Sequence, residues 1–135
     1  YWARQSIWFE AERGGRAFRD ATWRLLVSHI PPVDREVLKG LPPIDQVPQR
    51  TRRTPVAADD DFAAVISAHI HRPRFFPPGA DGRQWALFIG GAHPFERATA
   101  IRVDGTATTL AIRLYASSGE VIAQHDWHAK STPVD

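Results

Sequence analysis

Several stretches in the last third of the chain carry apolar residues at every second position, and this pattern limits the possible folds more than any other feature. In the stretch RQWALFIG, the apolar residues Trp85, Leu87 and Ile89 occupy every second position. The stretch RATAIRV at 97–103 shows the same alternation. Because the side chains of a β-strand point to its two faces in turn, such stretches predict half-buried strands. The chain is therefore expected to end in an antiparallel sheet.

The sequence TTLAIRLYASSGEVIAQHDW predicts a hairpin within this sheet. Its apolar residues Leu110, Ile112 and Leu114 would share one face of the first strand. The turn sequence SSGE supplies Gly119, which adopts a positive φ at little cost. An Asp-Gly pair at 104–105 is a second turn sequence, placed before the hairpin. Three or more strands joined by short turns are expected as a result.

Residues 1–30 are expected to form a helical lead segment. Its second part, GGRAFRDATWRLLVSHIPP, begins with the glycine pair Gly14 and Gly15, which interrupts the earlier piece YWARQSIWFEAER. One apolar stripe in the second part follows helical spacing and consists of Phe18, Thr22, Leu25, Leu26 and His29. Pro31 and Pro32 end the pattern, since proline lacks the backbone N–H and disfavours helix in the preceding residue.

Residues 31–58 are expected to be a connector rich in proline and arginine. Six of these residues are proline, and PQRTRRTP adds three arginines within a short space. Proline-rich runs of this kind are extended and semi-rigid. Structureless connections of such length are uncommon in compact domains, so we expect this one to wrap the surface or to contact a partner.

A short central helix is expected between about residues 60 and 71. The aspartates at 59–61 can cap its first turn and favour the positive end of the helix dipole. The residues that then follow helical spacing are Phe62, Val65, Ile66, His69 and Ile70. Pro73 would end this helix. The stretch AVISAHIH also permits alternation, so a strand is the competing interpretation.

Together these elements predict an α+β fold in a single domain, residues 1–135. The lead segment and the central helix would cover one face of an antiparallel sheet of about four strands, with residues 59–135 supplying the central helix and the sheet. A length of 135 residues suits one domain. No apolar run approaches the ~20 residues that a membrane-spanning helix needs, although an anchor upstream of Tyr1 stays compatible with the sequence.

Two histidine pairs raise the question of a metal site. The sequence HDWH at 125–128 would place its two histidines on opposite faces of a strand, which prevents both from holding one ion. The sequence HIH at 69–71 places its histidines on one face only in a strand. Zinc accepts histidine and carboxylate ligands. The candidate ligands are His69, His71, His93, His125 and His128. They would support a small metal-dependent hydrolase or nuclease of toxin type as an alternative interpretation, but the spacing favours neither a bound cofactor nor a catalytic residue.

Arginine-rich stretches suggest a second alternative, a nucleic-acid binder. The chain has 17 basic and 15 acidic residues, and the basic ones are nearly all arginine. The sequences RTRR at 50–53 and HRPR at 71–74 could form one basic strip with Arg102 and Arg113 of the sheet. The formal net charge of only +2 provides little long-range attraction for phosphates, however.

The primary interpretation is a non-enzymatic protein-interaction module, a subunit or soluble domain of a larger bacterial assembly. No catalytic motif is recognisable, whereas the first residues carry large aromatic side chains that need burial. The partner would be another protein or a second copy of the chain. The expected contact residues are Trp2, Trp8, Phe9, Arg52, Arg53, Phe75 and Phe76. The absence of cysteine and methionine is compatible with an extracytoplasmic setting such as the periplasm.

Overall fold

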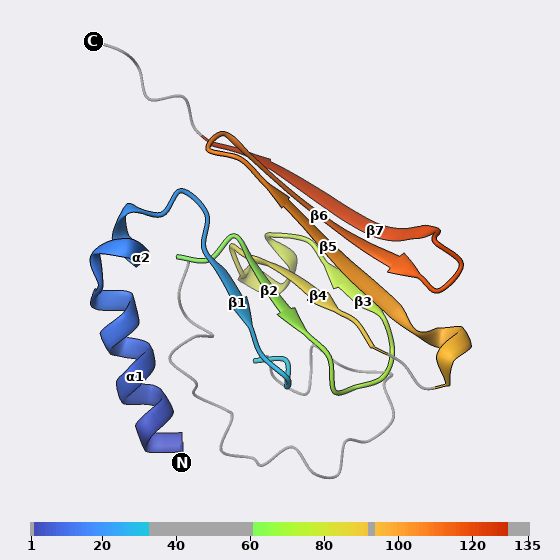
Figure 1. Cartoon of the computed structure of the whole chain (residues 1–135), viewed down its shortest axis with the longest axis horizontal. Helices are drawn as coiled ribbons and strands as arrows, with labels where there is room; N and C mark the ends of the chain where they lie inside the picture. Colours follow the sequence, from blue (N-terminus) through green and yellow to red (C-terminus); the bar gives the residue numbers. More distant parts are fainter. Residues whose placement is uncertain (1, 33–60, 92–93, 130–135) are drawn as a thin grey trace.

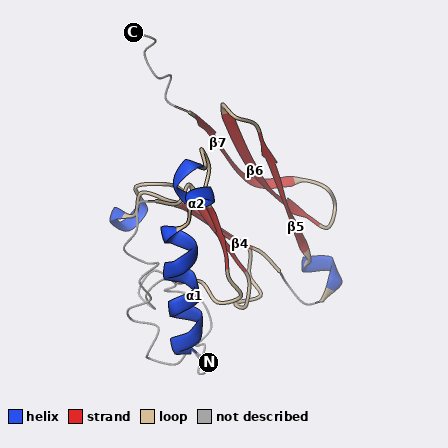
Figure 2. Cartoon of the chain, turned by 60° about the vertical axis from the view of Figure 1, so that its left-hand side comes forward, coloured by secondary structure: helices blue, strands red, loops and turns tan. Residues whose placement is uncertain are grey.

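The structure, a computed structural model, describes residues 2–32, 61–91 and 94–129, and these parts form three layers (Figure 1). Helices α1 (Trp2–Gly14) and α2 (Arg16–Asp20) pack on one face of a four-stranded sheet. A three-stranded sheet covers the opposite face, as a second view shows (Figure 2). The α+β class predicted from the sequence is confirmed.

The middle layer is a mixed sheet with the strand order β1-β2-β4-β3. Its first three neighbours, β1 (Leu25–Val27), β2 (Ala64–Ser67) and β4 (Ala86–Ile89), run parallel to one another. Strand β3 (Arg74–Phe76) pairs antiparallel with β4. The carboxyl ends of β1, β2 and β4 therefore meet at the same edge of the mixed sheet.

The outer sheet is an antiparallel meander of β5 (Thr99–Gly105), β6 (Thr109–Ala116) and β7 (Val121–His128). The predicted hairpin is confirmed, and Gly119 in its turn has a φ of 87°. The turn predicted at 104–105 is displaced, because β5 continues through Gly105 and pairs it with Leu110 of β6.

Two short 3-10 helices flank β4. The first, η3 (Ala80–Gly82), precedes it, and the second, η4 (Phe95–Arg97), leads into β5. Both helices lie outside the regular sheets and connect their strands.

The predicted central helix at 60–71 is wrong, because this stretch contains β2. The competing strand interpretation was the right one. Strand β2 lies between β1 and β4 and is buried against both neighbouring layers, so both of its faces are apolar. A strand buried on two sides reads as a continuous apolar run without clear alternation. The β-branched Val65 and Ile66 fit a strand better than a helix.

The predicted lead helix is correct as far as Asp20 and wrong beyond it, since residues 25–27 form β1. The side chain of Arg24 explains where α2 ends. Its guanidinium donates hydrogen bonds to the carbonyls of Phe18 at 2.6 Å and Arg19 at 2.8 Å. A cationic donor that satisfies the last carbonyls of a helix stabilises its carboxyl end. Residues 33–58 of the connector predicted at 31–58 lie outside the described residues.

The single antiparallel sheet of the sequence-based prediction is replaced by two sheets, and each face of the mixed sheet has its own core. The core on the helix side consists of Phe62, Val65, Ile70, Trp85, Leu87 and Ile89. The core between the sheets consists of Ala64, Ala86, Phe88, Leu110, Ile112 and Leu114. The predicted common face of Trp85, Leu87 and Ile89 is confirmed. Strand β4 is fully buried because successive residues serve opposite cores.

Candidate functional site

Helix α1 presents large apolar side chains to solvent on its outer side. Ile7 is 71% exposed and Trp8 is 61% exposed. Arg4 and Ala11 are exposed as well. Residues three and four positions apart lie on the same side of a helix, so these four side chains form one stripe. We call this stripe, consisting of Arg4, Ile7, Trp8 and Ala11, the outer face of α1.

The inner side of α1 packs against the body of the protein through Phe9. The ring of Phe9 stacks on Phe62, with ring centroids 6.2 Å apart, and the edge of Phe18 meets Phe62 at 5.8 Å. Phe9 is half-buried. The sequence placed Phe9 among the contact residues together with Trp8, whereas the helix directs the two side chains differently.

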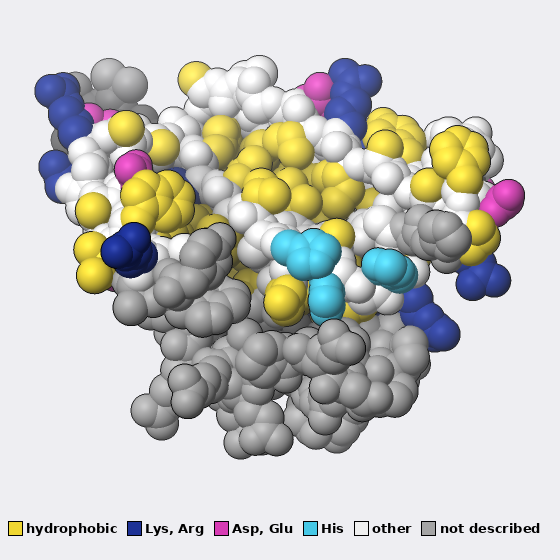
Figure 3. Space-filling model, turned by 60° about the horizontal axis from the view of Figure 1, so that its bottom comes forward, with side chains coloured by type: hydrophobic (Ala, Val, Ile, Leu, Met, Phe, Trp, Pro, Cys, Tyr) yellow, Lys and Arg dark blue, Asp and Glu magenta, His cyan; other side chains and the backbone are white. Residues whose placement is uncertain are grey.

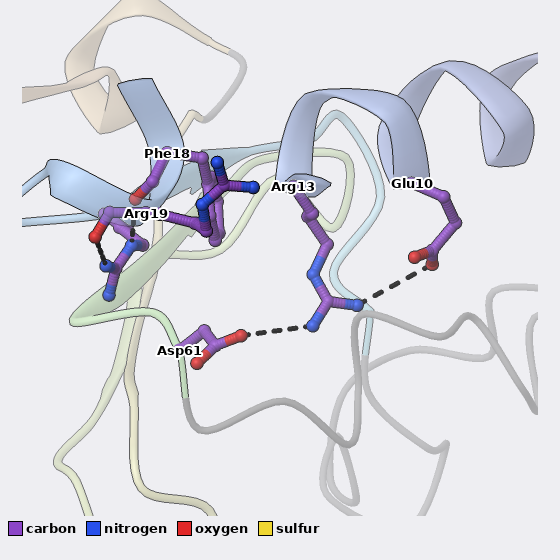
Figure 4. Close-up of polar contacts among 6 residues, drawn as sticks. Glu10, Arg13, Phe18, Arg19 and Asp61 are labelled. Carbon is purple, nitrogen blue, oxygen red and sulfur yellow. Dashed lines mark hydrogen bonds and ion pairs between the residues drawn. The ribbon is translucent and has the colours of Figure 1, made fainter. Parts of the chain in front are cut away.

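An arginine fixes the carboxyl end of α1 (Figure 4). The guanidinium of Arg13 donates to Asp61 at 3.1 Å and forms an ion pair with Glu10 at 3.6 Å. Arg19 donates to the carbonyl of Gly14, the last residue of α1. Exposed ion pairs contribute little individually, about 0–1 kcal/mol. The contact with Asp61 nevertheless joins the end of α1 to the segment that precedes β2.

The other predicted contact residues lie in different surroundings. The ring of Phe75 packs against Phe88 at 4.7 Å and His125 at 6.2 Å, between the two sheets. Phe76 packs on the opposite core, where Arg83 lies over its ring at 5.6 Å. Both phenylalanines are half-buried and contribute to the cores. The side chains of Trp2, Arg52 and Arg53 lie outside the part that the structure describes.

Other exposed apolar residues offer smaller surfaces. Val121 and Ile122 lie at the β-bulge of β7 and are 40% and 43% exposed. Phe95 in η4 is 80% exposed and lies between exposed neighbours, among them the charged Glu96. Single exposed apolar residues are common on protein surfaces. The outer face of α1 is therefore the stronger candidate for contact.

Histidine side chains gather on another face, at the carboxyl edge of the parallel strands (Figure 3). His29 follows β1 and His69 follows β2. The Nδ1 atom of His69 lies 2.9 Å from the Nε2 atom of His29, and the two rings meet at 81° with centroids 4.8 Å apart. The pKa of His69 is lowered from its ordinary value, chiefly by burial and further by the nearby charges of His29 and His71.

The backbone holds these two histidines in place. His69 has a φ of 61°, and the N–H of Ile70 donates to the carbonyl of Ala68 at 2.7 Å, so His69 lies at the centre of a γ-turn. The N–H of Ala68 donates to the carbonyl of His29 at 3.1 Å. Strained non-glycine residues of this kind occur at functional sites when the surrounding structure fixes them.

The remaining candidate ligands are dispersed. The rings of His125 and Trp127 contact each other at 4.4 Å on the inner side of β7, while His128 is exposed on the other side. The predicted separation of the two histidines of HDWH is thus confirmed. Within residues 2–32, 61–91 and 94–129, no three histidine, aspartate or glutamate side chains are placed to hold an ion together. His93 lies outside these ranges.

The arginines of the antiparallel sheet are paired with aspartates. Arg102 contacts Asp104 at 2.9 Å, and Arg113 lies 3.5 Å from Asp104 and 3.7 Å from Asp126. The hydrogen bond with Asp104 raises the pKa of Arg102. A phosphate backbone would have to compete with these carboxylates. The nucleic-acid alternative stays a prediction.

Two residues of these candidate sites, Ile7 and His29, were not predicted from the sequence. Ile7 was overlooked beside the aromatic residues, although its position next to Trp8 was a usable signal. His29 was assigned to the apolar stripe of a helix that ends before it. Only the parallel pairing of β1 with β2 brings His29 to His69, a contact across 40 positions of sequence.

Comparisons with known proteins do not assign the chain to a family. No family model matches it, and no curated protein sequence shows significant similarity. Among the described helices, none has the length and apolar character needed to cross a membrane.

Proposed function

We propose that this chain is a protein-interaction module that places the outer face of α1 in a groove of a partner protein, as a subunit or domain of a larger assembly. The supporting observation is that Ile7 and Trp8 are exposed on one side of α1 while Phe9 packs against Phe62 on the other. The helix is thus already held by one apolar side. Its second apolar side stays exposed to solvent in the described fold.

The spacing of the outer face matches a known mode of recognition. Helices that bind in grooves present contact residues at positions i, i+3, i+4 and i+7. Arg4, Ile7, Trp8 and Ala11 have this spacing. Tryptophan and arginine dominate the binding energy of many protein interfaces. A matching groove has an apolar floor, a hydrogen-bond acceptor for the indole N–H of Trp8 and a carboxylate opposite Arg4.

The available area favours a groove over a second copy of the chain. Ile7 and Trp8 together expose on the order of 300 Å², whereas stable interfaces bury about 800 Å² on each partner. Two copies that pair through this helix face alone would fall short of that area. A groove also covers the flanks of the helix and so buries more of it.

Photo-crosslinking tests this proposal in the cells that make the protein. The variant Trp8→p-benzoylphenylalanine places a cross-linker on the outer face, and Phe95→p-benzoylphenylalanine serves as the matched control at another exposed aromatic position. We expect one protein to be cross-linked from position 8, at a concave surface, and to bind the unmodified chain again when both are purified. Position 95 should give no such product.

Two other results would contradict the proposal. A cross-link between two copies of the chain would replace the partner groove with self-association. Equal products from both positions, or no product from position 8, would show that the outer face of α1 is not a docking surface.

A further inference from the structure

We propose that His29 and His69 together bind one divalent transition-metal ion at the carboxyl edge of strands β1 and β2. The ion belongs to the zinc, copper and nickel class, and it is held by the Nε2 atom of His29 and the Nδ1 atom of His69. This site is separate from the outer face of α1 and goes beyond the proposed docking function.

The separation of the two nitrogens suits a shared ion. Nε2 of His29 and Nδ1 of His69 are 2.9 Å apart. Bonds from histidine nitrogen to such ions are about 2.0–2.1 Å long. Two bonds of that length at a right angle, as in square-planar or octahedral sites, separate the nitrogens by about 2.9 Å, and a tetrahedral angle separates them by about 3.3 Å. The distance between the two nitrogens therefore fits the first of these geometries and lies about 0.4 Å below the second.

The orientation of the rings agrees with this role. An interplanar angle of 81° shows that the imidazoles are not stacked. When the protons reside on Nδ1 of His29 and Nε2 of His69, both facing nitrogens carry a free lone pair. Imidazole nitrogen suits zinc, copper and nickel, whereas magnesium and calcium prefer oxygen ligands. Since no third protein ligand is placed nearby among the described residues, water would fill the remaining positions.

The loops that carry the two histidines are tied together beside the site. The hydrogen bond from the backbone N–H of Ala68 to the carbonyl of His29 joins the loop after β2 to the loop after β1. The hydroxyls of Ser28 and Ser67, which precede the two histidines in the chain, share a hydrogen bond of 3.0 Å, and Ser67 is buried. A preformed pair of ligands loses less conformational freedom on binding than two independent side chains.

A hydrogen bond between the two imidazoles is the competing explanation of the same contact. In that case, one of the two facing nitrogens carries the proton and no ion is bound. The two explanations differ in a measurable way, because only the first predicts a stoichiometric ion that depends on both residues.

The test is calorimetric titration of the tag-free chain with zinc chloride, followed by native mass spectrometry, with magnesium chloride as the control ion. The variants are His29→Ala and His69→Gly, since His29 is exposed and glycine accepts the positive φ of position 69. The matched control is His128→Ala, which removes an exposed histidine from β7. Thermal unfolding confirms that each variant is folded.

The expected result is one zinc ion per chain, with binding at least ~10-fold weaker in His29→Ala and in His69→Gly. His128→Ala should bind as the unmodified chain does, and magnesium should not bind. The proposal is overturned by a chain that takes up no stoichiometric zinc, or by zinc binding that both variants retain.

Discussion

Phe88→Ala is expected to lower the free energy of unfolding by about 3–5 kcal/mol. Phe88 is 0% exposed and lies in the core between the two sheets. Its ring contacts Phe75 at 4.7 Å. Removal of a buried ring loses its transfer free energy and leaves a cavity that the surrounding strands fill only in part. Urea-induced unfolding measures the change.

The control for this prediction is Phe95→Ala, which removes the same ring from a site that is 80% exposed. A change within about 0.5 kcal/mol is expected there. Two variants of equal stability would show that the antiparallel sheet does not pack on the mixed sheet through Phe88.

The double variant Ile7→Ser with Trp8→Ser is expected to weaken binding of the cross-linked partner by at least ~30-fold. A central tryptophan of an interface typically contributes 2 kcal/mol or more, and each 1.4 kcal/mol corresponds to a factor of ten in affinity. Both side chains are exposed in the isolated chain, so their loss should leave the free energy of unfolding nearly unchanged. Calorimetric titration with the purified partner measures the affinity.

Phe95→Ser provides the comparison, because it also removes an exposed ring but far from the outer face of α1 in sequence. Its affinity for the partner should equal that of the unmodified chain. If the double variant binds as tightly as this control, the contact role of Ile7 and Trp8 is wrong.

The antiparallel sheet was the part of the fold that could be predicted from the sequence. Strand β6 alternates strictly, with Leu110, Ile112 and Leu114 buried and the residues between them half-buried. A strand with one covered face records that asymmetry in its sequence. The turn glycine Gly119 then fixes where the hairpin reverses.

The mixed sheet escaped prediction for a physical reason. Strand β2 is covered on both faces, so Val65 and Ile66 stand together and match helical spacing as well as strand spacing. Strand β1 has only three residues and depends on its parallel pairing with β2. The pairings of β2 with β1 and with β4 cannot be recognised from the local sequence, because each partner strand lies far away along the chain.

The candidate sites also differ in how far the local sequence reveals them. Trp8 was proposed as a contact residue from the sequence because large exposed aromatic residues need burial. The helix decides that Trp8 points outward while Phe9 points inward, and side-chain type alone could not separate them. The pair of His29 and His69 depends wholly on the parallel pairing of two strands, which the helical interpretation of both segments excluded.

Hydroxyl-radical footprinting of Trp8 tests the central claim most directly, since it reports the exposure of that one side chain. In the isolated chain, Trp8 should be oxidised readily, as its 61% exposure requires. In the complex with the cross-linked partner, oxidation of Trp8 should fall strongly while that of Phe95 stays the same. If Trp8 is oxidised equally in both states, the outer face of α1 is not where the partner binds.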